Sequence, residues 1–359
     1  MRRPLLIAAL PLAAVACLSR LTAPPGAETI LLVSDRSGAS RIEEMSLADG
    51  AAREVGGPPR GGAAAGDGAM GGGRSYQDSM PARLPDGRIA FVSDRDGVPR
   101  IYLVSADGAS VTPLTRDPAG TGPAGAGAAG APPAAADSDP APLGRDRIVF
   151  ARQEAGSPRG SARDLYLIGI DGHGLRRLTR DPADDHAPAG SPDGRSVVFV
   201  SDRSGAPRLL VLRDLDAAAL PESGLPQAMP LAASPPLPPG APGPWPADGA
   251  PAFLPDGTLV FRRAFSATLF HLFATEGSGR EARVRQITDG LSLPWGADEP
   301  VALPDDTILF VTGPVPPAKG MEGPPRFAVY RIAAGGFNLS RVTRERARYD
   351  DFTRRLDAR

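Results

Sequence analysis

Aspartates recur at one position of a repeated pattern, and they are the residues best placed to carry chemistry. Four of them stand three residues before a proline, a fifth takes the matching place and a sixth is displaced by one residue: Asp78, Asp137, Asp185, Asp248, Asp350 and Asp298. Large aromatic residues precede four of these positions: Tyr76, Trp245, Trp295 and Tyr349. Carboxylates in a ring can hold a cation or a basic partner, and next to a turn they cap backbone amides. The aromatics can hold a partner or wedge between repeats.

Other candidates for catalysis or metal binding are few. The three histidines fall in a turn, a connection and a strand, so they are not expected to converge: His173, His186 and His271. Asp184-Asp185-His186 is open to two interpretations, a ligand trio or a solvated loop. No Gly-x-Ser-x-Gly nucleophile turn occurs. We therefore expect a noncatalytic protein with no metal and no cofactor.

The recurring aspartates and aromatics belong to a strand pattern that repeats six times along the chain. Arg88–Gly97, Arg100–Gly108 and Val111–Thr115 each place apolar residues over a strand's length and end in a turn. The last apolar residue of the first strand recurs 49 to 62 residues apart, at Leu32, Phe91, Phe150, Phe199, Phe261 and Phe310. Repeats of about 40 to 50 residues with four strands are typical of β-propeller blades. The sequence predicts an all-β, six-bladed propeller with four-stranded antiparallel blades.

The fourth strand of each blade precedes the other three and lines the central channel. It ends in Pro-Asp-Gly turns at residues 85–87, 192–194 and 255–257, with degenerate forms near Asp146 and Asp306. The first blade has no such segment before it, but Asp350–Leu356 aligns without gaps on Asp78–Leu84. We therefore predict that the C-terminal segment supplies the missing strand and closes the ring, which removes an open sheet edge.

Several short motifs resemble one known family of repeats. These are Ser-Asp-Arg-Ser-Gly at 34–38 and 201–205, Ser-Asp-Arg-Asp-Gly at 93–97, the Pro-Asp-Gly turns, and Leu-Thr at 114–115 and 178–179. Together they resemble the TolB-type β-propeller repeat over residues 28–359. The resemblance implies an envelope scaffold that binds a peptidoglycan-associated lipoprotein or another envelope protein. TolB itself has an α/β domain before its propeller, and we expect this chain to lack it.

The Ser-Asp-Arg aspartates have a simpler expected role. Asp35, Asp94 and Asp202 are followed by a turn glycine, and aspartate readily accepts amide N–H groups two residues on. We expect them to stabilise their turns and assign them no chemistry.

The N-terminus has the pattern of an export signal. Arg2 and Arg3 precede an apolar stretch, and Ala14-Val15-Ala16 forms a small-residue cleavage site before Cys17, the only cysteine. We expect a signal peptide over residues 1–16, a tether over 17–27 with Cys17 lipidated, and the propeller over 28–359. An ordinary secretory site is the alternative. Leu18 follows the cysteine, so by resemblance to enterobacterial sorting we expect the outer membrane of a Gram-negative bacterium.

Charge and loop placement indicate the kind of partner. The 40 basic and 41 acidic residues nearly cancel, which argues against nucleic acid. Gly, Ala and Pro-rich insertions, including 56–73 and 118–136, all fall on one face, that of the blade-to-blade crossovers. We predict that a protein or peptidoglycan-associated partner binds there, without a small-molecule ligand, through Tyr76, Asp78, Trp245, Asp248, Trp295 and Asp298. The alternative is a small-ligand or metal-binding propeller with lactonase-like activity in its channel, which would retain metal on purification.

Overall fold

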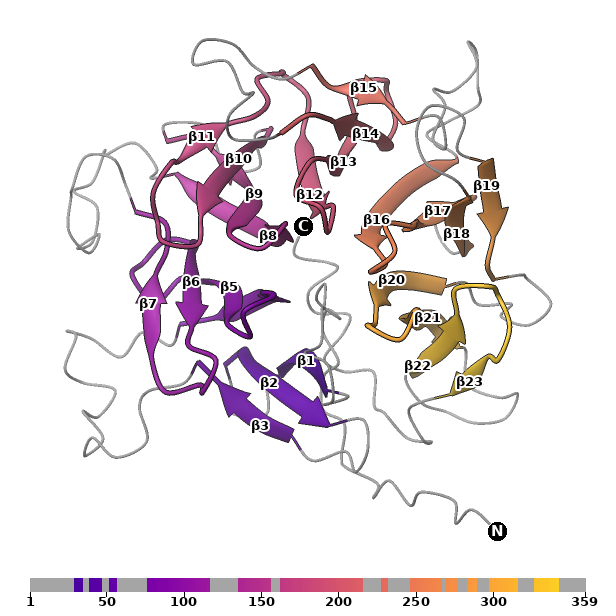
Figure 1. The fold of residues 1–359 in the computed structure, drawn as a ribbon, viewed down its shortest axis with the longest axis horizontal. Coiled ribbons are helices and arrows are strands. Elements are labelled where there is room, and N and C mark those ends of the chain that lie inside the picture. Colours follow the sequence, from indigo (N-terminus) through magenta and orange to yellow (C-terminus); the bar gives the residue numbers. More distant parts are fainter. Residues whose placement is uncertain are drawn as a thin grey trace.

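The computed structural model has the predicted six-bladed β-propeller architecture (Figure 1). It describes residues 29–34, 39–46, 52–56, 76–116, 135–155, 162–215, 227–231, 246–266, 269–276, 283–288, 297–315 and 326–341. These residues form six antiparallel sheets around a central axis, five with four strands and the first with three. All regular structure in the described ranges is β-strand, and these ranges contain no helix with the length and hydropathy that a bilayer crossing requires.

The strands follow the same order in every blade, from the channel outward. The first blade consists of β1 (Thr29–Ser34), β2 (Arg41–Ser46) and β3 (Ala52–Val55). The innermost strands of the other blades are β4 (Asp78–Arg83), β8 (Ala136–Leu143), β12 (Asp185–Gly190), β16 (Ala247–Phe253) and β20 (Ala297–Ala302). The second strands are β5 (Ile89–Ser93), β9 (Arg147–Gln153), β13 (Val197–Ser201), β17 (Leu259–Ala264) and β21 (Thr307–Val315). The third strands are β6 (Arg100–Val104), β10 (Asp164–Gly169), β14 (Arg208–Leu212), β18 (Phe270–Glu276) and β22 (Arg326–Ala333). The outermost are β7 (Val111–Pro113), β11 (Arg176–Arg177), β15 (Met229–Pro230), β19 (Arg283–Gln286) and β23 (Ser340–Arg341).

The core lies between neighbouring blades and repeats with them. A fully buried phenylalanine occupies the same place in every second strand from β5 to β21: Phe91, Phe150, Phe199, Phe261 and Phe310. In four blades it faces an aromatic residue on the third strand, with ring centroids 5.8 to 5.9 Å apart. These pairs favour phenylalanine at this position in those four blades, since aromatic rings contribute a large part of the buried area.

The ring is closed by side-chain packing on both sides of the first blade. Ile30 and Ile42 belong to one apolar cluster with Phe91 of the second blade and with Val301 and Leu309 of the sixth. The predicted closing strand, Asp350–Leu356, lies outside the described residues.

Each described innermost strand contains a β-bulge before its proline. The bulged residues have a left-handed backbone with φ between 46° and 52°: Met80, Asp139, Ala187, Ala250 and Glu299. Proline cannot donate to the sheet ladder, so it is tolerated where pairing is already interrupted. A β-bulge bends its strand and increases the local twist.

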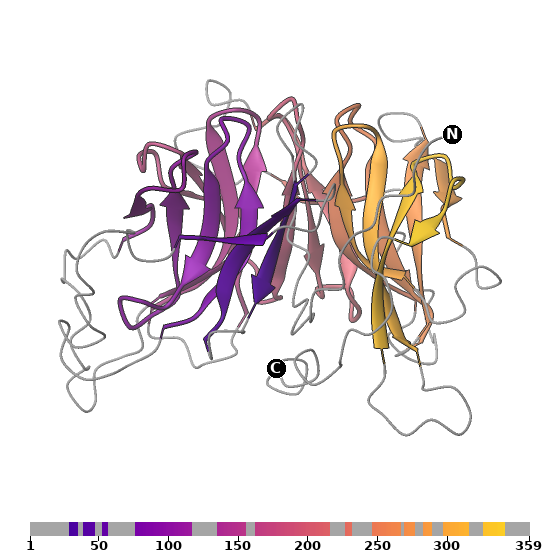
Figure 2. The same ribbon diagram turned by 90° about the horizontal axis from the view of Figure 1, so that it is seen from below.

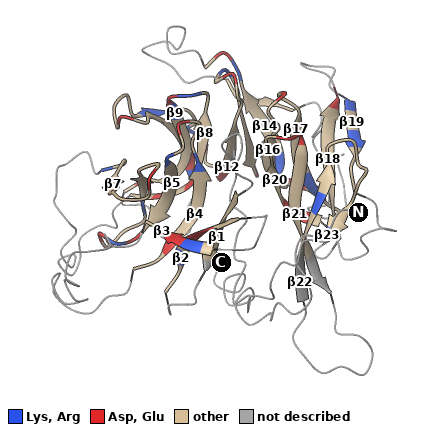
Figure 3. Cartoon of the chain, turned by 60° about the horizontal axis from the view of Figure 1, so that its bottom comes forward, with Lys and Arg blue, Asp and Glu red and all other residues tan. Residues whose placement is uncertain are grey.

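The propeller has two faces, and the strands run between them (Figure 2). The crossover face carries the blade-to-blade connections and the turns between second and third strands. The turn face carries the turns between first and second strands, including the Pro-Asp-Gly turns, and those between third and fourth strands. Acidic and basic residues are interspersed along strands and turns (Figure 3), in keeping with the balanced net charge.

Candidate functional site

The recurring aspartates begin the innermost strands at the crossover face, and four of them are buried and ion-paired. Asp78, Asp137, Asp185 and Asp248 are each at most 1% exposed. Their carboxylate oxygens lie 3.2, 2.6, 2.8 and 2.7 Å from the guanidinium groups of Arg95, Arg152, Arg203 and Arg263, respectively. Burying a carboxylate is costly unless it is paired and hydrogen-bonded, and these arginines meet that requirement. The pairs therefore form a repeated framework beneath the crossover face.

Two different positions supply the arginine. In the second and fourth blades it comes from the Ser-Asp-Arg turn, while the serine, Ser93 or Ser201, stands opposite the aspartate. In the third and fifth blades Arg152 and Arg263 themselves take the serine's place. Both solutions bring a guanidinium to the same carboxylate. The sequence alone did not indicate this pairing, because the arginine changes its repeat position from blade to blade.

The Ser-Asp-Arg aspartates form hydrogen bonds to the backbone just before the innermost strand of the same blade. Asp94 Oδ1 accepts the amide N–H of Gln77 at 2.6 Å, and Asp202 Oδ1 accepts that of Asp184 at 2.9 Å. These amides differ from the expected ones, which lie two residues on within the turn. Asp35 lies outside the described residues. The motif is structural, as predicted, but it joins two strands rather than stabilising a single turn.

The Leu-Thr motif links neighbouring blades. Thr115 accepts the amide N–H of Ile101 at 3.0 Å and donates its hydroxyl to Asp137 of the next blade at 2.5 Å. Thr179 and Thr288 accept the corresponding amides of Leu165 and Leu272. Each threonine therefore satisfies a backbone donor that would otherwise be buried without a partner.

Burial raises the pKa of two framework carboxylates. It raises the pKa of Asp78 above its usual value, although Ser93 and Arg95 act in the opposite direction. It likewise raises the pKa of Asp185 against the influence of Ser201 and Arg203. The predicted site residues Asp78 and Asp248 thus lie within the framework, where they position neighbouring residues and do not present a carboxylate to solvent.

Asp298 and Tyr76 are the predicted site residues that the structure describes at least partly in solvent. Asp298 has a side chain 27% exposed and pairs at 2.9 Å with Arg262 of the preceding blade. Tyr76 is half-buried, and the guanidinium carbons of Arg41 and Arg95 lie 3.9 and 4.9 Å from its ring centroid. Cys17, Trp245 and Trp295 lie outside the described residues.

A polar cluster around Arg163 was not anticipated from the sequence. Arg163 binds Asp184 at 2.7 Å and Asp139 at 3.2 Å, and His186 Nδ1 lies 3.3 Å from Asp184. Burial works against ionisation of Asp184, but Arg163 outweighs it and lowers the pKa of that carboxyl. Burial and the charge of Arg163 also lower the pKa of His186. Asp184 and Asp185 bind different arginines, and the described residues contain no group of three His, Cys, Asp or Glu suited to a metal.

One large apolar side chain is exposed on the crossover face among the described residues. Phe265, in the turn after β17, is 43% exposed, with its ring centroid 5.8 Å from that of His271. The other exposed large apolar residues in the described ranges belong to turns or strand ends nearer the turn face: Leu175, Phe337 and Leu339. Sequence reasoning missed Phe265, because a single phenylalanine at a strand end gives no signal of exposure.

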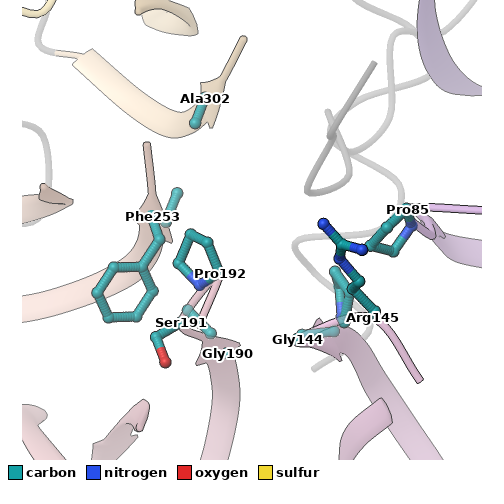
Figure 4. A pocket seen from close by; sticks show the side chains of 12 residues that line it. Pro85, Gly144, Arg145, Gly190, Ser191, Pro192, Phe253 and Ala302 are labelled. Atoms are coloured by element: carbon teal, nitrogen blue, oxygen red, sulfur yellow. The ribbon is translucent and has the colours of Figure 1, made fainter. Parts of the chain in front are cut away.

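At the opposite end of the channel, the structure contains a cavity of about 250 Å³. It lies where four successive innermost strands, β8 to β20, end at the turn face. Alanine, glycine and proline dominate its lining, together with Phe253, Ser191 and Arg145 (Figure 4). The described residues of the predicted binding set, Tyr76, Asp78, Asp248 and Asp298, lie at the other end of the channel.

Comparison with known proteins supports the TolB-type resemblance. A TolB homologue from Chlorobium luteolum is 30% identical over 151 residues, which make up 34% of this chain and 34% of that protein. The Tol-Pal system protein TolB of Bordetella pertussis is 46% identical over 46 residues, 12% of this chain and 10% of its own. These matches span about a third or less of the curated relatives. No protein-family model matches the chain.

Solved structures share the propeller fold. TolB from Acinetobacter baumannii has a TM-score of 0.53 and 15% identity, with 86% of this chain and 61% of that chain covered. A puromycin hydrolase has a TM-score of 0.55 and 17% identity, with 93% and 47% covered. An oligogalacturonate lyase from Vibrio parahaemolyticus has a TM-score of 0.54 and 11% identity, with 91% and 77% covered. At these identities the likeness concerns the fold alone. Together, the sequence matches and the six-bladed ring are consistent with a propeller similar to that of TolB.

Proposed function

We propose that this TolB-like propeller is a noncatalytic scaffold of the bacterial cell envelope that binds a protein or peptidoglycan-associated partner through its crossover face. The observation that carries the proposal is the buried aspartate-arginine framework at that face. A framework of paired charges holds the start of four innermost strands in place. Loops of variable length on such a rigid support are where binding is usually found.

The binding surface in this proposal is a rim of aromatic residues that stand two or three positions before the recurring aspartates. These residues are Tyr76, Trp245 and Trp295, and the two tryptophans share one position in the repeat. Tyr76 stacks on Arg41 and Arg95 and shows how such a residue is supported. Asp298 and Phe265 add a half-exposed carboxylate and an exposed ring on the same face. Large aromatics surrounded by energetically weaker contacts are common hot spots of protein interfaces.

The partner test uses crosslinking and pull-down from native envelopes, followed by mass spectrometry. Trp245→Ala combined with Trp295→Ala should abolish capture of the main partner while leaving the melting temperature near that of the unmodified protein. Each hot-spot truncation typically costs about 2 kcal/mol or more of binding. Phe337→Ala is the matched control, because Phe337 is 62% exposed on the turn face. If the double variant folds and still captures every partner, the proposed binding role of the rim is wrong. If it unfolds, the tryptophans are needed for packing between blades.

The location in this proposal is the envelope of a Gram-negative bacterium, with a lipid on Cys17. Its support is the charged, apolar and small-residue pattern of residues 2–16 before the cysteine. A single acyl chain binds a membrane only marginally, so stable attachment requires more than one chain. Mass spectrometry of the mature protein should find cleavage between Ala16 and Cys17 with acylation of Cys17. A mature N-terminus with an unmodified Cys17 and a free amine contradicts the lipid attachment.

A further inference from the structure

One turn on the turn face breaks the rule that the other complete blades follow. Four blades place an aspartate at the middle of the turn between the first and second strands: Asp86, Asp193, Asp256 and Asp305. Each accepts the backbone N–H two residues on, at 2.8 to 3.2 Å. The third blade has Arg145 at this position, with Leu143 and Arg147 flanking it as Leu84 and Arg88 flank Asp86. Arginine has no acceptor, so the exchange gives up the turn's hydrogen bond and reverses its charge.

Neighbouring groups hold this turn in place without using the arginine. The amide N–H of Gly144 donates to the carbonyl of Ser191 in the next blade at 3.2 Å. Arg147 forms an ion pair with Asp146, with Nε and Oδ1 3.7 Å apart, so the Asp146 carboxylate already has a cationic partner. Arg145 itself is exposed, and within the described part of the chain no hydrogen bond or ion pair of its guanidinium is found. An arginine that replaces a stabilising residue and forms no such contact is a candidate for ligand binding.

Arg145 lies at the rim of the turn-face cavity. Figure 4 shows Arg145 and Pro85 on one side of the cavity and Phe253, Pro192 and Ala302 on the other. Alanines from four successive innermost strands line it: Ala141, Ala189, Ala252 and Ala302. Small side chains leave the space open, and Phe253 adds an aromatic wall. The cavity therefore combines an apolar interior with one cation at its edge.

We propose that this cavity binds a small organic carboxylate. Its apolar body lies among the alanines and against Phe253, and its carboxylate accepts hydrogen bonds from the Arg145 guanidinium. The planar guanidinium fork matches a carboxylate in two parallel hydrogen bonds. The volume of about 250 Å³ is slightly below the usual range for ligand sites, so a small acid or a single C-terminal residue of a peptide fits the space better than a larger molecule.

This site is separate from the described part of the proposed partner rim, because Tyr76 and Asp298 lie at the opposite end of the channel. It also departs from the sequence-based expectation that the chain takes no small-molecule ligand. That expectation rested on the TolB-type resemblance and on the lack of a catalytic motif, and a binding cavity built from small residues leaves no motif in the sequence.

The test measures binding of matched acids and amides by isothermal titration calorimetry and ligand-observed NMR. The probes are 3-phenylpropionate, hexanoate and acetyl-alanyl-phenylalanine, each beside its neutral amide. The unmodified protein should bind at least one acid about ten-fold more tightly than its amide, since hydrogen bonds to charged groups exceed neutral ones by this order. Preference for the free acids over the peptide, or the reverse, identifies the source of the ligand.

Arg145→Asp is the decisive variant, because it restores the aspartate of the other four turns and should therefore fold. It should lower the affinity for the acid about ten-fold or more and leave that for the amide unchanged. Arg195→Asp makes the same charge change in the next blade's turn, outside the cavity lining, and should leave acid binding nearly intact. The proposal is overturned if no acid binds saturably below about 10 mM, or if both variants weaken acid binding equally.

Discussion

A buried carboxylate at the start of an innermost strand requires a cation beside it, because an unpaired charge inside a protein is strongly destabilising. Asp137 shows how completely this requirement is met. Two guanidinium nitrogens of Arg152 bind its two oxygens at 2.6 and 3.0 Å, and Thr115 adds a hydroxyl donor. Arg152 also lies 5.3 Å from the ring centroids of Phe150 and Tyr166. The pair thus joins the strand entry, the aromatic core and the preceding blade.

Removing one member of this pair should be costly. Asp137→Ala leaves Arg152, 5% exposed, buried without its counter-ion, and should lower the free energy of unfolding by about 3 to 5 kcal/mol in urea denaturation. The matched control is Glu276→Ala, which breaks the exposed pair with Arg285 and should cost less than about 1 kcal/mol. Equal losses in the two variants would show that the framework pair contributes no more than a surface one.

The lowered pKa of Asp184 predicts how stability depends on pH. A carboxyl whose pKa is lower in the folded than in the unfolded state adds stability above its unfolded value near 3.8, and that stability is lost as pH falls through the folded pKa. Asp184→Asn should therefore lower the melting temperature at about pH 7 and have progressively less effect toward about pH 3. Asp78 and Asp185, whose pKa values are raised, contribute with the opposite sign. A melting-temperature difference that is constant with pH would refute the role of the Arg163 pair.

At the scale of strands and turns, the sequence predicted several of the features that recur from blade to blade. The places of the second strands were predicted, because Phe91 and its equivalents stand in short apolar runs between turns, and Arg88–Gly97 and Arg100–Gly108 contain β5 and β6. The bulges were not predicted. Their left-handed residues are Met80, Asp139, Ala187, Ala250 and Glu299, and none is the glycine or asparagine that normally indicates such a conformation.

The candidate site was predictable in part. The register of the aspartates follows from the repeat, so their place at the crossover face could be derived from the sequence. Their burial could not, because the arginine partner stands in the turn in two blades and in the strand in two others. The cavity near Arg145 was equally hidden, since it depends on how closely strands from different blades approach one another.

Gly190 lies at a close approach between the innermost strands β12 and β8. A Cβ there would meet the carbonyl oxygen of Pro142 at 2.1 Å and the Cα of Leu143 at 2.8 Å, both backbone atoms of β8. Gly190→Ala should therefore lower the free energy of unfolding by about 1 to 3 kcal/mol, the usual cost of overpacking. Urea denaturation measures the loss.

The control for this variant is Gly174→Ala, at a turn glycine with φ of +70° and open space around it. Gly174→Ala introduces only backbone strain, about 1 kcal/mol, whereas Gly190→Ala introduces a steric clash between two blades. If Gly190→Ala is no more damaging than Gly174→Ala, the third and fourth blades can shift apart, and tight packing of the innermost strands is not required for stability.

For the whole molecule, the first blade is the place where the ring is least complete in the described residues. Its sheet has three described strands, and the inner edge of β1 faces the channel without a described partner. Side-chain packing against the second and sixth blades already holds β1 and β2 in position. A strand added at that edge would pair the remaining backbone groups and complete the repeat.

Removal of Tyr349–Arg359 should therefore destabilise the entire ring. In the aligned repeats Asp350 corresponds to Asp78 and Arg36 to Arg95, so the tail would supply both the missing strand and its framework carboxylate. The comparison is deletion of most of Gly56–Gly73, which keeps Gly56 because its carbonyl accepts a hydrogen bond from Arg95. This deletion shortens a connection and should cost little, because loop length enters stability only logarithmically. Thermal melts should show a clearly lower transition for the tail deletion and a nearly unchanged one for the loop deletion. If the tail deletion melts like the full chain, the ring is held by side-chain packing of the first blade, and the closing strand must be sought elsewhere.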